Sequence, residues 1–140
     1  MCTTLFSYNY NVNYPIIIAS NRDEFYNRPT LDVNFWNNYP NIIGGIDQKC
    51  LGTWLGMTRE GKIGILTNYR DPKNHQKKLK SRGLLLKKFL THDLSIDDFI
   101  QILIKNKDEY NGYNIIFGNF EKMVYYSNKQ NKIKILDSGI

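Results

Sequence analysis

Cysteine and histidine are scarce in this sequence. Only two cysteines, Cys2 and Cys50, and two histidines, His75 and His92, occur among the 140 residues. Two cysteines do not make the disulfide framework of a small secreted domain, nor a cysteine-based zinc site. In a reducing compartment both side chains should be free thiols. The composition therefore excludes disulfide-rich and zinc-stapled domains.

Long hydrophobic runs are missing as well. No apolar run reaches the roughly 18 residues that a membrane-spanning helix needs, so we expect no stable membrane insertion. The first residues lack the basic region and the apolar core of a signal peptide. We therefore expect a soluble intracellular protein, located in the cytoplasm.

Negative charge is in the minority. The 13 Asp and Glu residues face 19 Lys and Arg residues, which leaves a net charge of +6. Much of the excess lies between Lys73 and Lys88, and such a balance permits binding to anions without establishing it. Because no aromatic side chains interleave with these cations to stack bases, we interpret the stretch as solvated surface and expect no nucleic-acid partner.

The chain has the length of one domain, residues 1–140, and its pattern predicts strands, then two helices, then strands. Residues 30–40 are interpreted as irregular, with Phe35, Trp36 and Tyr39 covering the core. This order predicts an α+β fold with helices packed outside antiparallel sheets. The predicted strands are 3–8, 16–20, 42–47, 53–58, 62–68, 113–117, 123–127 and 132–136, and the first helix is 81–91.

The second helix is the clearest predicted element. Ser95, followed by Asp98 three residues later, resembles a capping box in which Asp replaces the more usual Glu. Apolar residues then recur at helical spacing, which predicts one buried face. These residues are Ile96, Phe99, Ile100, Leu103 and Ile104.

The first two predicted strands form a hairpin through a turn rich in Asn, with Pro15 at its end. Antiparallel pairing brings the start of one strand beside the end of the next, so Cys2 should lie close to Asn21, Arg22 and Asp23. If Met1 is trimmed, the thiol and a free α-amine share one residue. An α-amine has a pKa of about 7.7–8.0 in model peptides, so it can act as the thiol's general base. The alternative is a small buried cysteine at a strand start.

Charge is concentrated directly after the second predicted strand. Arg22, Asp23, Glu24 and Arg28 lie within seven residues. Charges at the end of a buried strand must be paired or solvated, because an unpaired buried charge is very costly. One interpretation is a surface loop held by Arg–carboxylate pairs, and the other is a preorganised electrostatic site beside Cys2.

Several motifs occur together in one order along the chain. With this combination the chain resembles the NRDE family, which is named for four of these residues and includes the transport and Golgi organisation 2 proteins. The resemblance is dense over about residues 1–90 and looser beyond. The motifs are Met1-Cys2-Thr3, Asn21-Arg22-Asp23-Glu24-Phe25, Arg28-Pro29, Gly44-Gly45, Gly52-Thr53-Trp54-Leu55-Gly56, Leu66-Thr67-Asn68-Tyr69-Arg70-Asp71-Pro72 and Ser81-Arg82-Gly83.

The NRDE family is similar in turn to the cysteine branch of the N-terminal nucleophile hydrolases. This relationship implies an αββα sandwich in which Cys2 is the nucleophile, Arg22 and Asp23 follow the second strand, and Asn68 is an oxyanion donor. Members of the family are usually longer than 140 residues. We therefore expect the chain to be the N-terminal part of a longer domain and its sandwich to be incomplete.

Two classes of function follow from the residues and the resemblance. In the first, Cys2 attacks a small-molecule amide without a cofactor, Asp23 orients the α-amine, Arg22 stabilises the thiolate or a substrate carboxylate, and Asn68 holds the oxyanion. In the second, the protein is a non-enzymatic trafficking, Golgi-organisation or haem-handling protein, as the eukaryotic members of the family imply. Candidate haem ligands are Cys2, Cys50, His75 and His92, none of which lies in a ligation motif.

Overall fold

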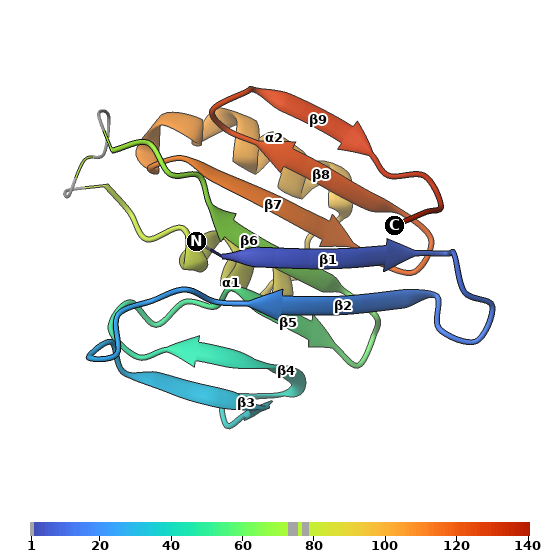
Figure 1. The fold of residues 1–140 in the computed structure, drawn as a ribbon, viewed down its shortest axis with the longest axis horizontal. Coiled ribbons are helices and arrows are strands. Elements are labelled where there is room, and N and C mark those ends of the chain that lie inside the picture. The colour runs from blue at the N-terminus through green and yellow to red at the C-terminus, as the bar shows by residue number, and fades with distance from the viewer. Residues whose placement is uncertain (1, 73–75, 77–78) are drawn as a thin grey trace.

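A seven-stranded antiparallel sheet carries two helices on one face and a two-stranded hairpin on the other (Figure 1). The computed structural model describes residues 2–72, 76 and 79–140. The hairpin consists of β1 (Thr3–Tyr8) and β2 (Ile16–Asn21). The larger sheet follows chain order: β3 (Thr30–Trp36), β4 (Tyr39–Asp47), β5 (Leu55–Thr58), β6 (Ile63–Asn68), β7 (Tyr113–Gly118), β8 (Met123–Ser127) and β9 (Lys132–Ile135).

Between β6 and β7 the chain forms α1 (Gly83–Thr91), α2 (Ile96–Lys105) and a 3₁₀ turn (Lys107–Glu109). Neither described helix, at nine and ten residues, has the length and apolar run needed to cross a bilayer. The α+β prediction is confirmed, and the described layers run helix, large sheet, hairpin (Figure 1).

Side-chain alternation along β6 creates the two faces of the large sheet. Gly64 faces α1, because a Cβ at this position would meet the Leu86 side chain at 2.2 Å. Its neighbours Ile63 and Ile65 face the hairpin, where Ile63 shares a groove with Ile18 of β2. The missing side chain at Gly64 therefore lets α1 pack closely on the sheet.

Three phenylalanines join the helices to the sheet. The ring centroids of Phe89 in α1 and Phe99 in α2 lie 4.8 Å apart, and Phe117 in β7 packs edge-on against both at 5.3 and 4.8 Å. All three side chains are buried. Aromatic pairs at such distances add stabilisation beyond the apolar area that they bury, so this cluster fixes both helices on one face.

The capping of α2 follows the sequence prediction in part. The backbone N–H of Asp98 donates to Ser95 Oγ at 3.0 Å, as an N-cap requires. The Ser95 hydroxyl in turn donates to the Asp98 carboxylate at 2.6 Å. Phe99 and Leu103 are buried as predicted, but Ile104 is 36% exposed, so its predicted place in the buried stripe is wrong.

The irregular segment predicted for residues 30–40 is also wrong, because it contains β3 and the start of β4. Trp36 is buried and donates from Nε1 to the Gly44 carbonyl at 2.9 Å, but Phe35 and Tyr39 are exposed. A strand signal was present in the alternation of Leu31, Val33 and Phe35 with polar residues. Val33 lines the groove beside Ile16 and Ile18 of the hairpin, and Phe35 pairs with Ile43, which lines the same groove. Leu31 instead pairs with Ile46, which packs against the helix-side core, because the register shifts between Leu31 and Asn34.

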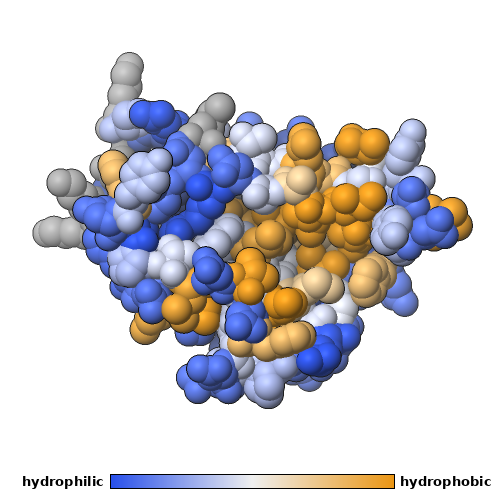
Figure 2. Space-filling view, turned by 60° about the horizontal axis from the view of Figure 1, so that its bottom comes forward, coloured by the Kyte–Doolittle hydropathy of each residue, from blue (hydrophilic) through white to orange (hydrophobic). Residues whose placement is uncertain are grey.

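The hairpin leaves part of the large sheet uncovered. An apolar groove of about 340 Å³ runs between Ile16 and Ile18 of β2 and residues of β3 to β6, including Ile43 and Met57. Figure 2 shows hydrophobic side chains gathered over the centre and right of this face, with hydrophilic ones at the left. On the opposite side of the hairpin, Tyr8 of β1 pairs with Gly139 through two backbone hydrogen bonds of 2.9 and 2.8 Å.

Candidate functional site

The register of the hairpin brings Cys2 to Asp23. Thr3 pairs with Asn21, so the residues that flank the two strands at this end must meet. The backbone N–H of Asp23 donates to Cys2 Sγ at 3.4 Å, and the thiol lies 3.9 Å from the Asp23 carbonyl oxygen. The predicted hairpin is confirmed, and it holds the Cys2 sulfur against the backbone that follows β2.

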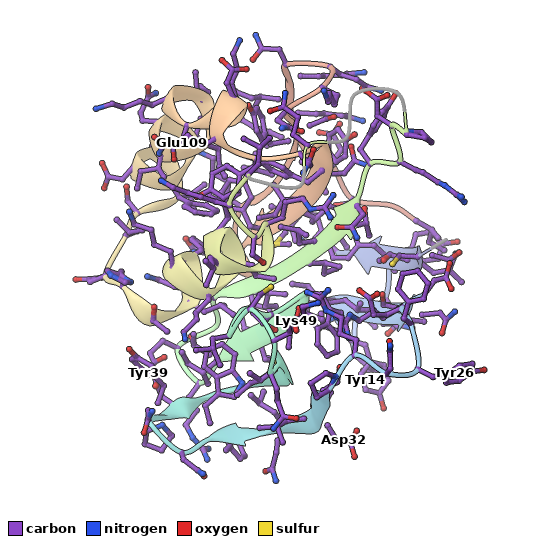
Figure 3. The ribbon with its side chains drawn as sticks, turned by 90° about the vertical axis from the view of Figure 1, so that its left-hand side faces the viewer. Tyr14, Tyr26, Asp32, Tyr39, Lys49 and Glu109 are labelled. Carbon is purple, nitrogen blue, oxygen red and sulfur yellow. The ribbon has the colours of Figure 1, made fainter. Side chains whose placement is uncertain are left out.

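A cavity of about 310 Å³ lies beside Cys2, at the lower end of the range for small-molecule sites. Figure 3 looks onto this end of the molecule, where Lys49 lies near the middle of the view and Tyr26 projects outward. All four site residues predicted from the sequence line the cavity. The lining side chains that carry charge, a thiol or an amide include Cys2, Arg22, Asp23, Glu24, Arg28, Asp47, Cys50, Asn68 and Arg82.

Arg22 is largely committed to protein partners. Its guanidinium lies over the Trp54 ring, 4.3 Å from the centroid, and donates to Thr30 Oγ1 at 2.9 Å. It also lies 3.6 Å from carboxylate oxygens of both Glu24 and Asp47. Arg22 therefore forms a fixed wall of the cavity, joined to the large sheet through residues of β3, β4 and the segment before β5.

Arg28 binds the end of β4. Its Nε and one terminal nitrogen lie 3.0 and 2.6 Å from the same oxygen of Asp47, and Nε lies 3.6 Å from Glu24. The same terminal nitrogen donates to Cys50 Sγ at 3.3 Å. The interpretation of residues 22–28 as a loop held by Arg–carboxylate pairs is thus supported, with Asp47 as a partner from outside the loop.

The environment of Asp47 fixes its charge. Burial alone raises the pKa of this carboxyl, but the hydrogen bond and charge of Arg28 oppose that effect. Backbone N–H groups of Lys49 and Cys50 also donate to Asp47 Oδ1, at 3.1 and 3.4 Å. Together they hold the pKa of Asp47 below its usual value, and the hydrogen bond from Arg28 to Asp47 raises the pKa of Arg28.

Asn68 is the last residue of β6, paired in register with Tyr113 of β7. It lines the same cavity as Cys2 and Asp23. The site residues therefore come from two sheets: Cys2, Arg22 and Asp23 from the hairpin and Asn68 from the large sheet. Their catalytic roles stay predictions.

Arg82 is a cavity residue that the sequence did not single out as part of the site. It precedes α1, whose first residue, Gly83, packs against Gly52 so closely that a Cβ on Gly52 would lie 2.5 Å from the Gly83 carbonyl carbon. The Thr53 N–H donates to the Gly83 carbonyl at 3.1 Å. Arg82 itself donates to the Gly112 carbonyl at 2.9 Å. The hydrogen bond to Gly112 thus holds the Arg82 side chain, and the packing of Gly83 holds the backbone that follows it.

Cavity residues that the sequence did not assign to the site include Asp47, Cys50 and Arg82. For Asp47 a signal was available, because it is a charge at the end of the apolar run 42–46, as Arg22 and Asp23 are at the end of β2. Cys50 follows in the next turn. Nothing local in the sequence shows that the start of α1 reaches this cavity.

The candidate haem ligands do not come together as a haem site. Cys2 and Cys50 line a cavity walled by charges, whereas His92 lies exposed at the end of α1 with Nδ1 2.9 Å from Thr91 Oγ1. His75 lies outside the described residues. Among the described residues no group of His, Cys, Asp and Glu could hold a metal ion. Haem handling by this chain stays a prediction.

Part of the basic stretch Lys73–Lys88 can be placed. Lys80 pairs with Glu109, and Lys87 donates to the Leu51 carbonyl at 3.0 Å. Lys73, Lys77 and Lys78 lie outside the described residues. Lys80 and Lys87 thus bind the protein's own groups, and the interpretation of the whole stretch as solvated surface stays a prediction.

The structure defines an α+β protein with two antiparallel sheets and a cysteine at the start of a hairpin, beside a charged cavity; this architecture is consistent with an N-terminal nucleophile-like sandwich. The chain belongs to the transport and Golgi organisation 2 family, whose profile matches residues 1–140.

Individual relatives agree with the family assignment. The chain is 39% identical over 124 residues to the Transport and Golgi organization 2 homolog of Mus musculus and 36% identical over 124 residues to that of Homo sapiens. It is 32% identical over 129 residues to Transport and Golgi organization protein 2 of Drosophila melanogaster. Each match covers 83% of this chain and 45% of the relative, so the chain spans less than half the length of these relatives.

Proposed function

We propose that the chain supplies the nucleophile and much of the binding cavity of a cysteine-dependent amide hydrolase. The observation that supports this function is the position of Cys2 Sγ, 3.4 Å from the Asp23 N–H at the wall of a charged cavity of about 310 Å³. A positioned thiol beside a cavity with convergent polar groups is the arrangement that nucleophilic catalysis requires.

The first half of the reaction forms a thioester. After removal of Met1, the α-amine of Cys2 takes the thiol proton, and the thiolate attacks the carbonyl carbon of the amide. The tetrahedral intermediate carries its negative charge on oxygen, where the Asn68 side-chain amide serves as a donor. The intermediate collapses as the C–N bond breaks, and the Cys2 ammonium returns the proton to the leaving amine.

The second half releases the acid. The Cys2 α-amine, again neutral, takes a proton from a water molecule as the water oxygen attacks the thioester carbonyl. The C–S bond then breaks, the thiol recovers a proton, and a carboxylic acid leaves. Asp23 is placed next to Cys2 to orient the ammonium that forms in each half, while the Arg22 and Arg28 ion pairs hold the cavity wall.

Hydrolysis assays with matched cysteine variants test this function. A panel of N-acyl amides, followed by mass spectrometry of the released acid, should show turnover that Cys2→Ala lowers by at least about 100-fold. Cys50→Ala is the matched control, because Cys50 lines the same cavity and is given no step; its turnover should stay within about 3-fold of the unmodified chain. Equal turnover in Cys2→Ala and the unmodified chain would overturn the proposal.

A second candidate is a binding role in transport or Golgi organisation, the subject of the relatives' names. The apolar groove between β2 and β3 to β6 favours it, since exposed apolar surface of this kind marks interaction sites. Such a role does not need the Cys2 thiol. A Cys2→Ala chain that restores secretion and Golgi morphology as well as the unmodified chain, in cells lacking it, would favour this candidate.

A further inference from the structure

Three guanidinium groups line the cavity, and they differ in their partners. Arg22 lies within 3.6 Å of Glu24 and Asp47, and Arg28 binds Asp47 at 2.6 Å. Among the described residues, no carboxylate forms an ion pair with Arg82, whose hydrogen bond goes to the neutral Gly112 carbonyl at 2.9 Å. A guanidinium has five N–H donors, so most of those on Arg82 have no protein acceptor there.

Arg82 is a partly buried cation at the cavity wall. Burial lowers the pKa of Arg82 below its usual value and the nearby positive charge of Arg28 lowers it further, while the charge of Glu24 acts in the opposite direction. An arginine stays protonated at neutral pH even so. Arg82 therefore keeps a partly buried positive charge at the wall of the cavity that holds Cys2, with no carboxylate among the described residues in an ion pair with it.

We propose that Arg82 binds a carboxylate group of the substrate, so that the amide cleaved at Cys2 belongs to an N-acyl amino acid or a similar monoanion. The inference rests on the proposed function, and it moves the anchor for a substrate carboxylate from Arg22 to Arg82. A planar guanidinium fork matches the two oxygens of a carboxylate.

The charge of the cavity lining favours a single negative charge on the ligand. Arg22 and Arg28 are compensated by Glu24 and Asp47, and the fourth cation of the lining, Lys80, pairs with Glu109 outside it. The third acidic residue of the lining is Asp23, beside Cys2. A dianion would face these three carboxylates with only Arg82 unopposed. Like-charge repulsion in a partly buried site is costly, so the lining selects a monoanion.

Anchoring of Arg82 makes it suited to positioning a ligand. Its guanidinium is held by Gly112, and the backbone on its C-terminal side is held by the close contact of Gly83 with Gly52 and Thr53. A preorganised donor binds more tightly because less side-chain entropy is lost on binding. A carboxylate on Arg82 would fix one end of the substrate while the amide reaches Cys2.

Alkylation of Cys2 by two reagents of similar size tests the inference without any need for turnover. Iodoacetate carries a carboxylate and iodoacetamide is neutral, so their rate ratio at Cys2 reports attraction of a carboxylate to the cavity. Arg82→Gln should lower this ratio by about 10-fold, the effect of losing a charge-assisted hydrogen bond. Arg82→Lys, which keeps the charge and is the safer variant for folding, should lower it by less.

Two controls accompany the ratio of iodoacetate to iodoacetamide rates at Cys2. Arg59→Gln removes the same charge from a guanidinium that lies over the Phe35 ring, at 4.3 Å, outside the cavity lining, and should leave the ratio within about 2-fold. Cys50, which contacts Arg28, should show a smaller response to Arg82→Gln than Cys2. An equal fall of the Cys2 ratio in Arg59→Gln and Arg82→Gln, or no fall in Arg82→Gln, would overturn the inference.

Turnover assays distinguish a failure of the Arg82 inference from a failure of the proposed hydrolase function. If amides are hydrolysed, Arg82→Gln should lower kcat/KM for an N-acyl amino acid by at least about 10-fold but leave its primary-amide derivative within about 2-fold. Loss of both substrates to the same extent would overturn the inference while the hydrolase stands. Suppose that the unmodified chain shows no turnover but has a higher ratio of iodoacetate to iodoacetamide rates at Cys2 than Arg82→Gln. That result would support the carboxylate site and count against the hydrolase.

Discussion

Asp47 forms ion pairs with both Arg22 and Arg28, although the sequence prediction centred on the charges of residues 22–28. Its carboxylate meets Arg28 at 2.6 Å and Arg22 at 3.6 Å. These contacts join the segment after β2 to the end of β4. We therefore expect Asp47, rather than Asp23 alone, to determine how firmly this part of the site is built.

Asp47→Asn should lower the free energy of unfolding by about 1–3 kcal/mol at pH 7, because Arg28 loses the carboxylate that it hydrogen-bonds and keeps only Glu24, at 3.6 Å. The folded pKa of Asp47 is below its unfolded value near 3.9, so its contribution is complete above that value. It is lost as the pH falls through the folded pKa. Urea unfolding between pH 7 and pH 3 should show the variant and the unmodified chain converging at the acid end.

Asp32→Asn is the matched control for this measurement, since Asp32 is an exposed carboxylate on β3 (Figure 3). Its effect should stay within about 0.5 kcal/mol. A deficit of Asp47→Asn that is the same at pH 7 and at pH 3 would show that the charge of Asp47 is not what stabilises the fold.

The sequence could predict residues that approach each other through local structure. Cys2 and Asp23 lie at the open end of one hairpin, so pairing rules alone bring them together. Asp47 and Arg82 reach the cavity only because the end of β4 and the start of α1 meet at the same end of the strands of the large sheet. That approach depends on contacts such as Gly52 against Gly83, which no local pattern specifies.

At the scale of elements, local periodicity predicted both helices and most of the strands to within a few residues. The prediction failed at β3, whose apolar residues alternate but stay exposed, and whose pairing with β4 is irregular between Leu31 and Asn34. It also failed at Ile104, because helical spacing gives the direction of a buried face but not its width. Packing partners decide that width, and they come from distant strands.

The docking of α2 can be measured with two neighbouring positions. Leu103 is fully buried. Leu103→Ala should lower the free energy of unfolding by about 2–5 kcal/mol, because the substitution leaves a cavity. Ile104 is 36% exposed, so Ile104→Ala should lower the free energy of unfolding by less than about 1.5 kcal/mol. Urea denaturation of both variants provides the comparison, and equal losses would mean that α2 docks in another orientation.

At the scale of the whole molecule, the two-stranded hairpin is smaller than the sheet that it covers. Val33 of β3 is 62% exposed and lines the apolar groove with Ile16 and Ile18. The relatives that the chain matches are more than twice as long as the matched part. The open face is therefore the part of the molecule where we expect apolar ligands to bind.

Val33→Asn should reduce the fluorescence of the dye ANS bound to the native chain, because it places a polar group in the groove. Val12→Asn is the control: Val12 is 94% exposed but lies in the turn between β1 and β2, outside the groove. Its dye fluorescence should not change. Equal dye binding by both variants and the unmodified chain would show that the groove does not act as an apolar surface.

Mass spectrometry of the chain after incubation with an amide substrate and an acid quench would examine the nucleophile itself. The N-terminal residue should be Cys2, and an acyl group should be attached to its sulfur. A Lys inserted between Met1 and Cys2 keeps the thiol but removes its α-amine, and should abolish the adduct. An adduct on Cys50, or an equal adduct on Cys2 in the insertion variant, would contradict N-terminal nucleophile chemistry.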